Sequence, residues 1–208
     1  MHRLKLFAVV AAFTLLAAGI LPTTVIAALE SQSSIEQTFQ KARQNYLEKN
    51  MDSAAQQIQK SASYMKAKAV KASDKGKEAL YKSSKELEKL ADDVKKGTVT
   101  SVKRIEETFA RAYVALAADS HFKSTELWAK KESAKAGDAL HSANKYFKRS
   151  FAWAGRKIEK KTKEAIKKSE ELSLQLKKKS TVVADDVGKR LKDAENEIEK
   201  FGKRIAAK

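Results

Sequence analysis

Histidine is the residue type through which this chain could bind a metal or haem, because the chain contains no cysteine. Its three histidines are His2, His121 and His141. His121 and His141 lie at similar distances on either side of a turn expected near Glu132, so an antiparallel hairpin would bring the two imidazoles level. No carboxylate at a fixed spacing supports a metal site there. We therefore expect two ordinary polar or half-buried histidines and no cofactor, and keep a metal or haem carrier using His121 and His141 as an alternative hypothesis.

The acidic residues show no pattern that would serve general acid–base catalysis. Three adjacent pairs occur: Asp92–Asp93, Glu106–Glu107 and Asp185–Asp186. Neighbouring side chains of a helix point about 100° apart, so the two carboxylates of a pair cannot face one substrate. The sequence also lacks a glycine-rich phosphate loop and a nucleophile elbow. We therefore expect a protein that is not an enzyme.

The strongest local charge lies between Lys145 and Lys168. This stretch holds ten Lys or Arg and two acidic residues, so its net charge is +8. Basic side chains beside a tryptophan are typical of a surface that contacts anionic lipid. The candidate contacts are Lys148, Arg149, Trp153, Arg156, Lys157, Lys160 and Lys161. The alternative is that Trp153 widens the buried stripe of a helix while the lysines keep the exposed face solvated.

The N-terminal segment predicts export. A short basic start is followed by an uncharged run from Leu6 to Leu29, and Val25 and Ala27 provide the small-residue spacing that a signal peptidase accepts. We expect residues 1–27 to be a cleaved signal peptide and the mature protein to be periplasmic or secreted. The alternative is an N-terminal membrane anchor, since about 20 apolar residues span a bilayer.

The composition predicts anionic partners. The chain has 43 Lys and Arg against 26 Asp and Glu, a net charge of +17. Such a balance concerns partners and solubility and does not determine the fold. For an exported protein the expected partners are anionic lipid, lipopolysaccharide or acidic proteins, and nucleic acid is expected only if export fails. The sequence does not identify a specific partner.

The chain carries strong helix signals and very few strand signals. Its one proline is Pro22, so nothing in the mature chain forbids long helices. Small and apolar residues recur about every 3.6 residues from Ile58 to Val94, and again from Leu140 to Ile205. This spacing predicts amphipathic helices whose narrow stripes pack against one another.

Caps and stop signals divide the chain into four expected helical stretches. The first begins at a capping box, Ser33 with Glu36, and ends near Asn50. The second runs from Asp52 to Gly97. The third begins near residue 100 and ends near 131 or breaks at Ser120, and the fourth begins near residue 133 and keeps its stripe through Ile205. The sequence leaves open whether the fourth is one continuous helix, because Gly155, residues 180–183 and Gly188 are places where it can bend or break.

Two segments of the chain match each other at a separation of 82 residues. The alignment pairs Tyr46 with Trp128, Lys49 with Lys131, Ala54 with Ala136, Ile58 with Leu140 and Met65 with Phe147. It predicts a diverged duplication of a helical hairpin, with one copy at 33–97 and the other at 100–206. The aromatic residue would close the first helix of each copy against the second, and the small residue would let the backbones approach. We therefore predict a single all-α domain at 28–208, an antiparallel bundle of long amphipathic helices with a long C-terminal helix.

The first copy resembles a tetratricopeptide-type hairpin over about 30 residues. The residues that carry the resemblance are Phe39, Ala42, Tyr46, Ala55 and Ala62. Arg43 stands where that family prefers glycine, and the closing proline is missing. The resemblance therefore implies a helix–turn–helix packing unit and not a solenoid. The chain is also similar to small periplasmic helical proteins of the YfdX type, through small and apolar residues at helical spacing.

These observations favour an envelope protein that acts by binding, as a scaffold, a chaperone-like protein or a stress-related factor. Seams rich in Ala, Ser, Gly and Thr bury little apolar area per turn, so we expect marginal stability or ordering by a partner. The second hypothesis is an amphipathic-helix binder of anionic lipid or lipopolysaccharide surfaces. The third is the metal or haem carrier described above.

Overall fold

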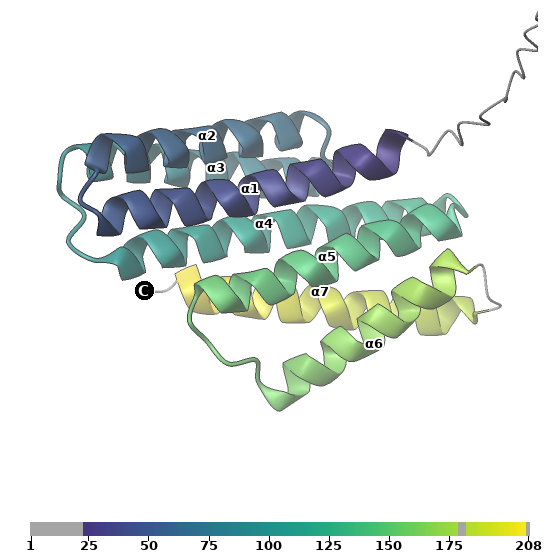
Figure 1. Cartoon of the computed structure of the whole chain (residues 1–208). Helices are drawn as coiled ribbons and strands as arrows, with labels where there is room; N and C mark the ends of the chain where they lie inside the picture. Colours follow the sequence, from purple (N-terminus) through teal and green to yellow (C-terminus); the bar gives the residue numbers. More distant parts are fainter. Residues whose placement is uncertain (1–22, 179–181, 207–208) are drawn as a thin grey trace, which may run out of the picture.

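The computed structural model describes residues 23–178 and 182–206, and it describes side chains from residue 35 onward. Within these ranges the chain forms seven α-helices and no strand, which confirms the predicted all-α bundle (Figure 1). The helices are α1 (Thr23–Leu47), α2 (Met51–Val70), α3 (Asp74–Lys95), α4 (Val102–Ala129), α5 (Ser133–Trp153), α6 (Lys160–Lys177) and α7 (Ala184–Ala206). Most of the predicted signal peptide, 1–27, lies outside the described residues. Among the described helices, none combines the length and the apolar character needed to cross a membrane.

Consecutive helices run in opposite directions, and each packs against the next one in the chain (Figure 1). Helix α4 is the central element, because it also packs against α1 and α7. The pair α2 and α3 lies on one side of the bundle, and α6 lies on the other. The α1–α2 turn, the α3–α4 connection and the α5–α6 loop are at the same end, at the left in Figure 1. This topology brings together residues of α1, α4 and α5 that are far apart in the sequence.

The predicted second helix, from Asp52 to Gly97, is two helices in the structure. Helix α2 ends at Val70, and α3 begins at Asp74 after a three-residue turn. Ser73 caps α3, because its Oγ accepts a hydrogen bond from the backbone N–H of Gly76 at 3.1 Å. Buried residues keep a helical spacing on both sides of the turn, so the stripe alone did not reveal the reversal. The prediction of one continuous helix was wrong for this reason.

The stretch from 133 to 206, whose continuity the sequence left open, forms the three helices α5, α6 and α7. Helix α5 ends at Trp153, just before Gly155, which has a φ of 60°. Glycine adopts this left-handed conformation without the steric cost of a side chain, and the break there is one of the expected ones. The second break falls at the expected 180–183 segment, between α6 and α7. Gly188 lies inside α7 and causes no break.

The structure also decides two other predicted helix boundaries, the start of α1 and the end of α4. Helix α1 begins at Thr23, well before Ser33, so Glu36 lies inside the helix and the predicted capping box is wrong. Helix α4 continues through Ser120 to Ala129 without a break. This position leaves the Glu36 carboxylate facing α4 and α5.

The two turns related by the predicted duplication have the same backbone geometry. Lys49 and Lys131, which the alignment superposes, have φ angles of 64° and 60°. The closing hydrogen bonds are Lys49 N to Tyr46 O (3.0 Å), Asn50 N to Asn45 O (2.8 Å), Lys131 N to Trp128 O (2.9 Å) and Glu132 N to Leu127 O (2.9 Å). This paired arrangement is the Schellman motif. A helical hairpin therefore turns at each of the two aligned positions, although α3 and α5 end with the same motif at Gly97 and Gly155.

The bundle has one large and one small apolar cluster. The large cluster joins the first five helices with parts of α6 and α7, and at its centre Phe39 stacks on Phe109 with ring centroids 4.0 Å apart. The small cluster consists of Ala136, Leu140, Leu172, Leu176, Val187 and Leu191. Trp128 is half-buried against the small cluster, as expected for the aromatic residue that closes the second hairpin. Ala54 and Ala136, the small residues of the two copies, are fully buried.

Candidate functional site

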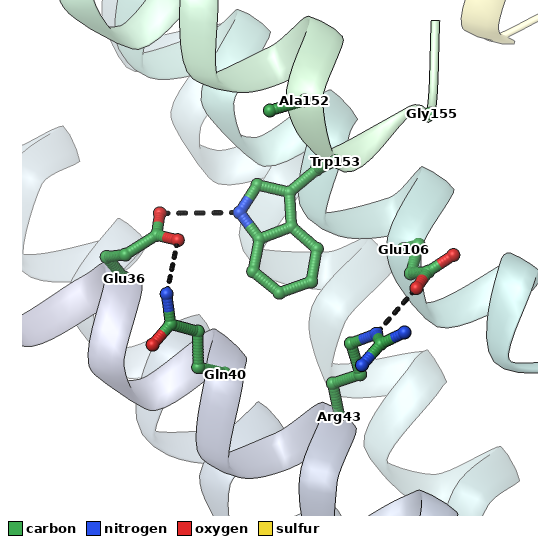
Figure 2. A pocket seen from close by; sticks show the side chains of 7 residues that line it. All are labelled: Glu36, Gln40, Arg43, Glu106, Ala152, Trp153 and Gly155. Carbon is green, nitrogen blue, oxygen red and sulfur yellow. Dashed lines mark hydrogen bonds and ion pairs between the residues drawn. The ribbon is translucent and has the colours of Figure 1, made fainter.

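A surface pocket lies where α1, α4 and the end of α5 meet (Figure 2). We call it the Trp153 pocket, and its volume is about 350 Å³. Its lining residues are Glu36, Gln40, Arg43, Glu106, Ala152, Trp153 and Gly155. Two carboxylates, a guanidinium, an amide and an indole therefore share one small space.

Glu36 is the central hydrogen-bond acceptor of the Trp153 pocket. The hydroxyl of Tyr113 donates to its Oε2 at 2.5 Å, and Nε1 of Trp153 donates to the same oxygen at 3.3 Å. Its Oε1 accepts from the amide of Gln40 at 3.0 Å and lies 3.7 Å from the guanidinium of Arg149. Burial and the bond to Glu36 raise the pKa of Tyr113, so this phenol stays protonated and donates at neutral pH.

Trp153 is held on its other side by the aromatic core. Its ring lies edge-on to Phe39 and Phe109, with centroid distances of 5.9 and 5.2 Å. Edge-to-face contacts of this kind stabilise a packed cluster beyond the area they bury. In the folded bundle the indole therefore packs against α1 and α4, and insertion of Trp153 into a lipid surface would have to break these contacts.

Arg43 and Glu106 join α1 to α4 at the opposite side of the pocket (Figure 2). Nε of Arg43 donates to Oε1 of Glu106 at 2.6 Å. Each carboxylate in the Trp153 pocket is thus bound to a donor from the protein itself. Such internal pairing favours a joint between three helices over acid–base chemistry on a substrate.

Two of the predicted basic contacts are paired with acidic residues. Lys148 lies 2.5 Å from Glu170 of α6, and Arg149 is the ion-pair partner of Glu36 already described. Both basic side chains are exposed. Their charge is partly balanced by their neighbours, so they contribute less to an anionic surface than the sequence suggested.

Four other predicted contacts gather where α5 leads into α6, directly after Gly155 of the pocket. We call Arg156, Lys157, Lys160 and Lys161 the basic corner. None of the four forms an ion pair with any residue whose side chain the structure describes, and the nearby Glu159 pairs instead with Arg204 of α7. Lys160 and Lys161 are exposed in the first turn of α6, which contains no acidic residue. The positive end of the helix dipole adds to their charge, so this corner is electrostatically unbalanced.

The two histidines of the carrier hypothesis do not share a surface. His121 is buried on α4 and faces Glu195 and Lys192 of α7, whereas His141 is exposed on α5. Burial lowers the pKa of His121 to about 4, against a smaller opposing effect of the Glu195 carboxylate. Across the described ranges, no three His, Asp or Glu side chains are grouped so as to hold a metal ion.

Sequence reasoning missed the network around Glu36. The residue was assigned to a helix cap, and its partners Tyr113 and Trp153 lie 77 and 117 positions further along the chain. No local spacing relates residues so far apart. The available signal was the density of aromatic residues between Phe109 and Trp153, which indicated an aromatic core but not the carboxylate that it surrounds.

Comparison with known proteins gives this chain no relative: no protein-family model, no curated protein and no solved structure matches it.

Proposed function

We propose that this protein is an exported helical bundle that acts by binding and not by catalysis, and that its basic corner contacts an anionic envelope component such as acidic lipid or lipopolysaccharide. The observation that carries the proposal is the unbalanced charge of Arg156, Lys157, Lys160 and Lys161 at the start of α6. Export is inferred from the N-terminal sequence. The related hypothesis, a scaffold or chaperone-like factor, would use the same corner to bind an acidic protein.

Unpaired basic residues at one corner suit a negatively charged surface. Each Lys or Arg close to an anionic membrane contributes roughly 1 kcal/mol of attraction, and the effect fades beyond a Debye length of about 8 Å at physiological salt. Lys157, Lys160 and Lys161 are all exposed. Their removal costs the fold no internal ion pair, so a change in binding can be separated from a change in stability.

The packing of Trp153 favours contact by the intact bundle over insertion of an unfolded amphipathic helix. The apolar stripes of α5 and α6 are buried against neighbouring helices, and the indole is bonded to Glu36. Binding through exposed lysines leaves these contacts in place. We therefore expect helicity to stay constant when anionic vesicles are added, whereas the amphipathic-helix alternative expects it to rise.

The test compares two triple charge reversals in vesicle cosedimentation. Changing Lys157, Lys160 and Lys161 to Glu should weaken binding to acidic vesicles by about a hundredfold, since roughly 1 kcal/mol is lost for each charge. The matched control changes Lys82, Lys85 and Lys89 to Glu on α3, where all three lysines are also exposed. Both variants alter net charge equally, and the control should lose much less.

Thermal melts of the two variants show whether the fold is intact. The reversal at the basic corner places acidic residues in the first turn of α6, where the helix dipole favours them, so its melting temperature should not fall. Equal loss of binding in both variants would show that net charge alone matters. No loss in either would overturn the anionic-surface proposal in favour of a protein partner.

A further inference from the structure

A small cavity lies between α5, α6 and α7, away from the Trp153 pocket. Its volume is about 10 Å³. The lining residues are Asn144, Phe147, Ala165, Ile166, Ser169, Ala194, Glu197 and Ile198. About this much space is needed to hold a single water molecule.

Polar groups from all three helices meet at this cavity. Asn144, Ser169 and Glu197 line it, and each is at least nine-tenths buried. Nδ2 of Asn144 and Oγ of Ser169 are buried without a hydrogen-bond partner among the described residues. A buried polar group without a partner destabilises the fold, so two of them at one cavity indicate a bound polar ligand.

Glu197 connects the cavity to an outer groove. Its Oε2 accepts a hydrogen bond from the hydroxyl of Thr162 at 2.5 Å. Glu197 and Ala165 also line a larger groove of about 260 Å³ between α6 and α7. Glu197 therefore borders both spaces, which gives a water molecule a short route of exchange.

We propose that the cavity is a binding site for one water molecule that bridges α5, α6 and α7. The water accepts from the Asn144 amide and donates to the Glu197 carboxylate, with Ser169 Oγ as its third partner. Buried waters in proteins typically make about three hydrogen bonds to groups that are otherwise unsatisfied, as here. None of the residues that line the cavity belongs to the basic corner, and the site assigns a structural role to polar residues on otherwise apolar helix faces.

Oxygen-17 magnetic relaxation dispersion, which counts long-lived water molecules directly, tests the proposal. Asn144→Leu keeps the side-chain shape and removes the donor, so the count should fall by one relative to the unmodified protein. Ser173→Ala is the matched control, because the buried Ser173 hydroxyl already donates to the Glu170 carbonyl at 2.9 Å. That variant should leave the count unchanged.

The melting temperature of Asn144→Leu gives a second readout, because a hydrated cavity and a dry cavity predict changes of opposite sign. If a water satisfies the amide, the substitution breaks a complete network and the melting temperature falls. If the cavity is dry, the substitution removes an unpaired buried amide and the melting temperature rises. Should Asn144→Leu fail to fold, Ser169→Val fills the cavity with a methyl group and is expected to lose the same water. An unchanged count in the folded variant overturns the proposal.

Discussion

The first five helices and the layer formed by α6 and α7 contain different shares of the buried apolar core. In the first five helices, stacked Phe39 and Phe109 form the centre of the large cluster, most of whose residues belong to these helices. The α6–α7 layer is held by aliphatic side chains of the small cluster and by Phe201, which stacks on Phe151 of α5 with ring centroids 3.8 Å apart. The layer contributes the smaller share of the buried apolar side chains, so it should open at a lower free energy than the rest.

This difference bears on the proposed function. The basic corner belongs to the α5–α6 connection and the first turn of α6, so it lies at the boundary between the two regions. A surface contact there leaves the aromatic core untouched whether or not the outer layer moves.

Acidification should weaken the α6–α7 layer first, through His121. The folded chain holds the pKa of His121 near 4, against about 6.5 in the unfolded chain. Between pH 6.5 and pH 4 the unfolded chain therefore binds a proton at this histidine that the folded chain does not bind. The free energy of unfolding has its full value above pH 6.5 and decreases as the pH drops toward 4. The shift corresponds to at most about 3 kcal/mol. The free energy of unfolding, measured in urea, should decrease with this slope between pH 7 and pH 5. His121→Gln should remove the decrease.

The exposed histidine provides the matched control for this experiment. His141 lies on α5 in contact with solvent, so His141→Gln should leave the slope in place. Hydrogen exchange at pH 5 should show the loss of protection chiefly in α7, which carries the charged neighbours of His121, Glu195 and Lys192. An equal loss in α2 and α3 would contradict the division into two regions.

Gly137 of α5 packs closely against α6, and a methyl group there should loosen the outer layer. A Cβ at Gly137 would lie 2.6 Å from the carbonyl oxygen of Ser173, which is backbone and can yield only if α6 shifts. Gly137→Ala should therefore cost about 1 to 3 kcal/mol. Hydrogen exchange measured by mass spectrometry should show the lost protection in α6 and α7.

Gly76 offers the equivalent contact in the first region. A Cβ there would collide with the side chain of Asp119 on α4, which is ion-paired with Lys123 at 2.8 Å. Gly76→Ala should reduce protection in α2, α3 and α4 instead. If both glycine variants lose protection over the whole chain, the bundle unfolds as one unit and the comparison fails.

The sequence predicted the parts of the fold that depend on local chemistry. Helix formers and spacing identified an all-α bundle, and the alignment placed the equivalent turns at Lys49 and Lys131. The chain reversals at residues 71–73 and 154–159 were missed or left open, because buried positions on both sides of each turn keep one helical phase. A hairpin and a continuous helix then show the same stripe.

The candidate site was predicted only in part, for a different physical reason. Local charge density located the basic corner, since its residues are neighbours in the chain. It did not show that Lys148 and Arg149 are paired with Glu170 and Glu36, because those contacts join separate helices. The role of Trp153 also depended on partners in α1 and α4 that no spacing rule connects.

The smallest expected effect concerns the two duplicated turns, both of which lie within the first five helices. Lys49 and Lys131 adopt φ angles of 64° and 60°, where a side chain costs about 1 kcal/mol or more and glycine has no such cost. Part of this gain is lost because glycine is freer in the unfolded chain, so Lys49→Gly and Lys131→Gly should each stabilise the protein by about 0.5 to 1 kcal/mol. Lys96→Gly is the control and should destabilise, because Lys96 has a φ of −77° in the helical region. Thermal melts measure the net change in stability.

Hydrogen exchange locates the effect of each variant. The Lys131 turn adjoins the small cluster, so Lys131→Gly should raise the protection of α5 and α6, whereas Lys49→Gly should raise that of α1 and α2. Destabilisation by either turn variant would show that its lysine side chain makes a contact worth more than the backbone strain.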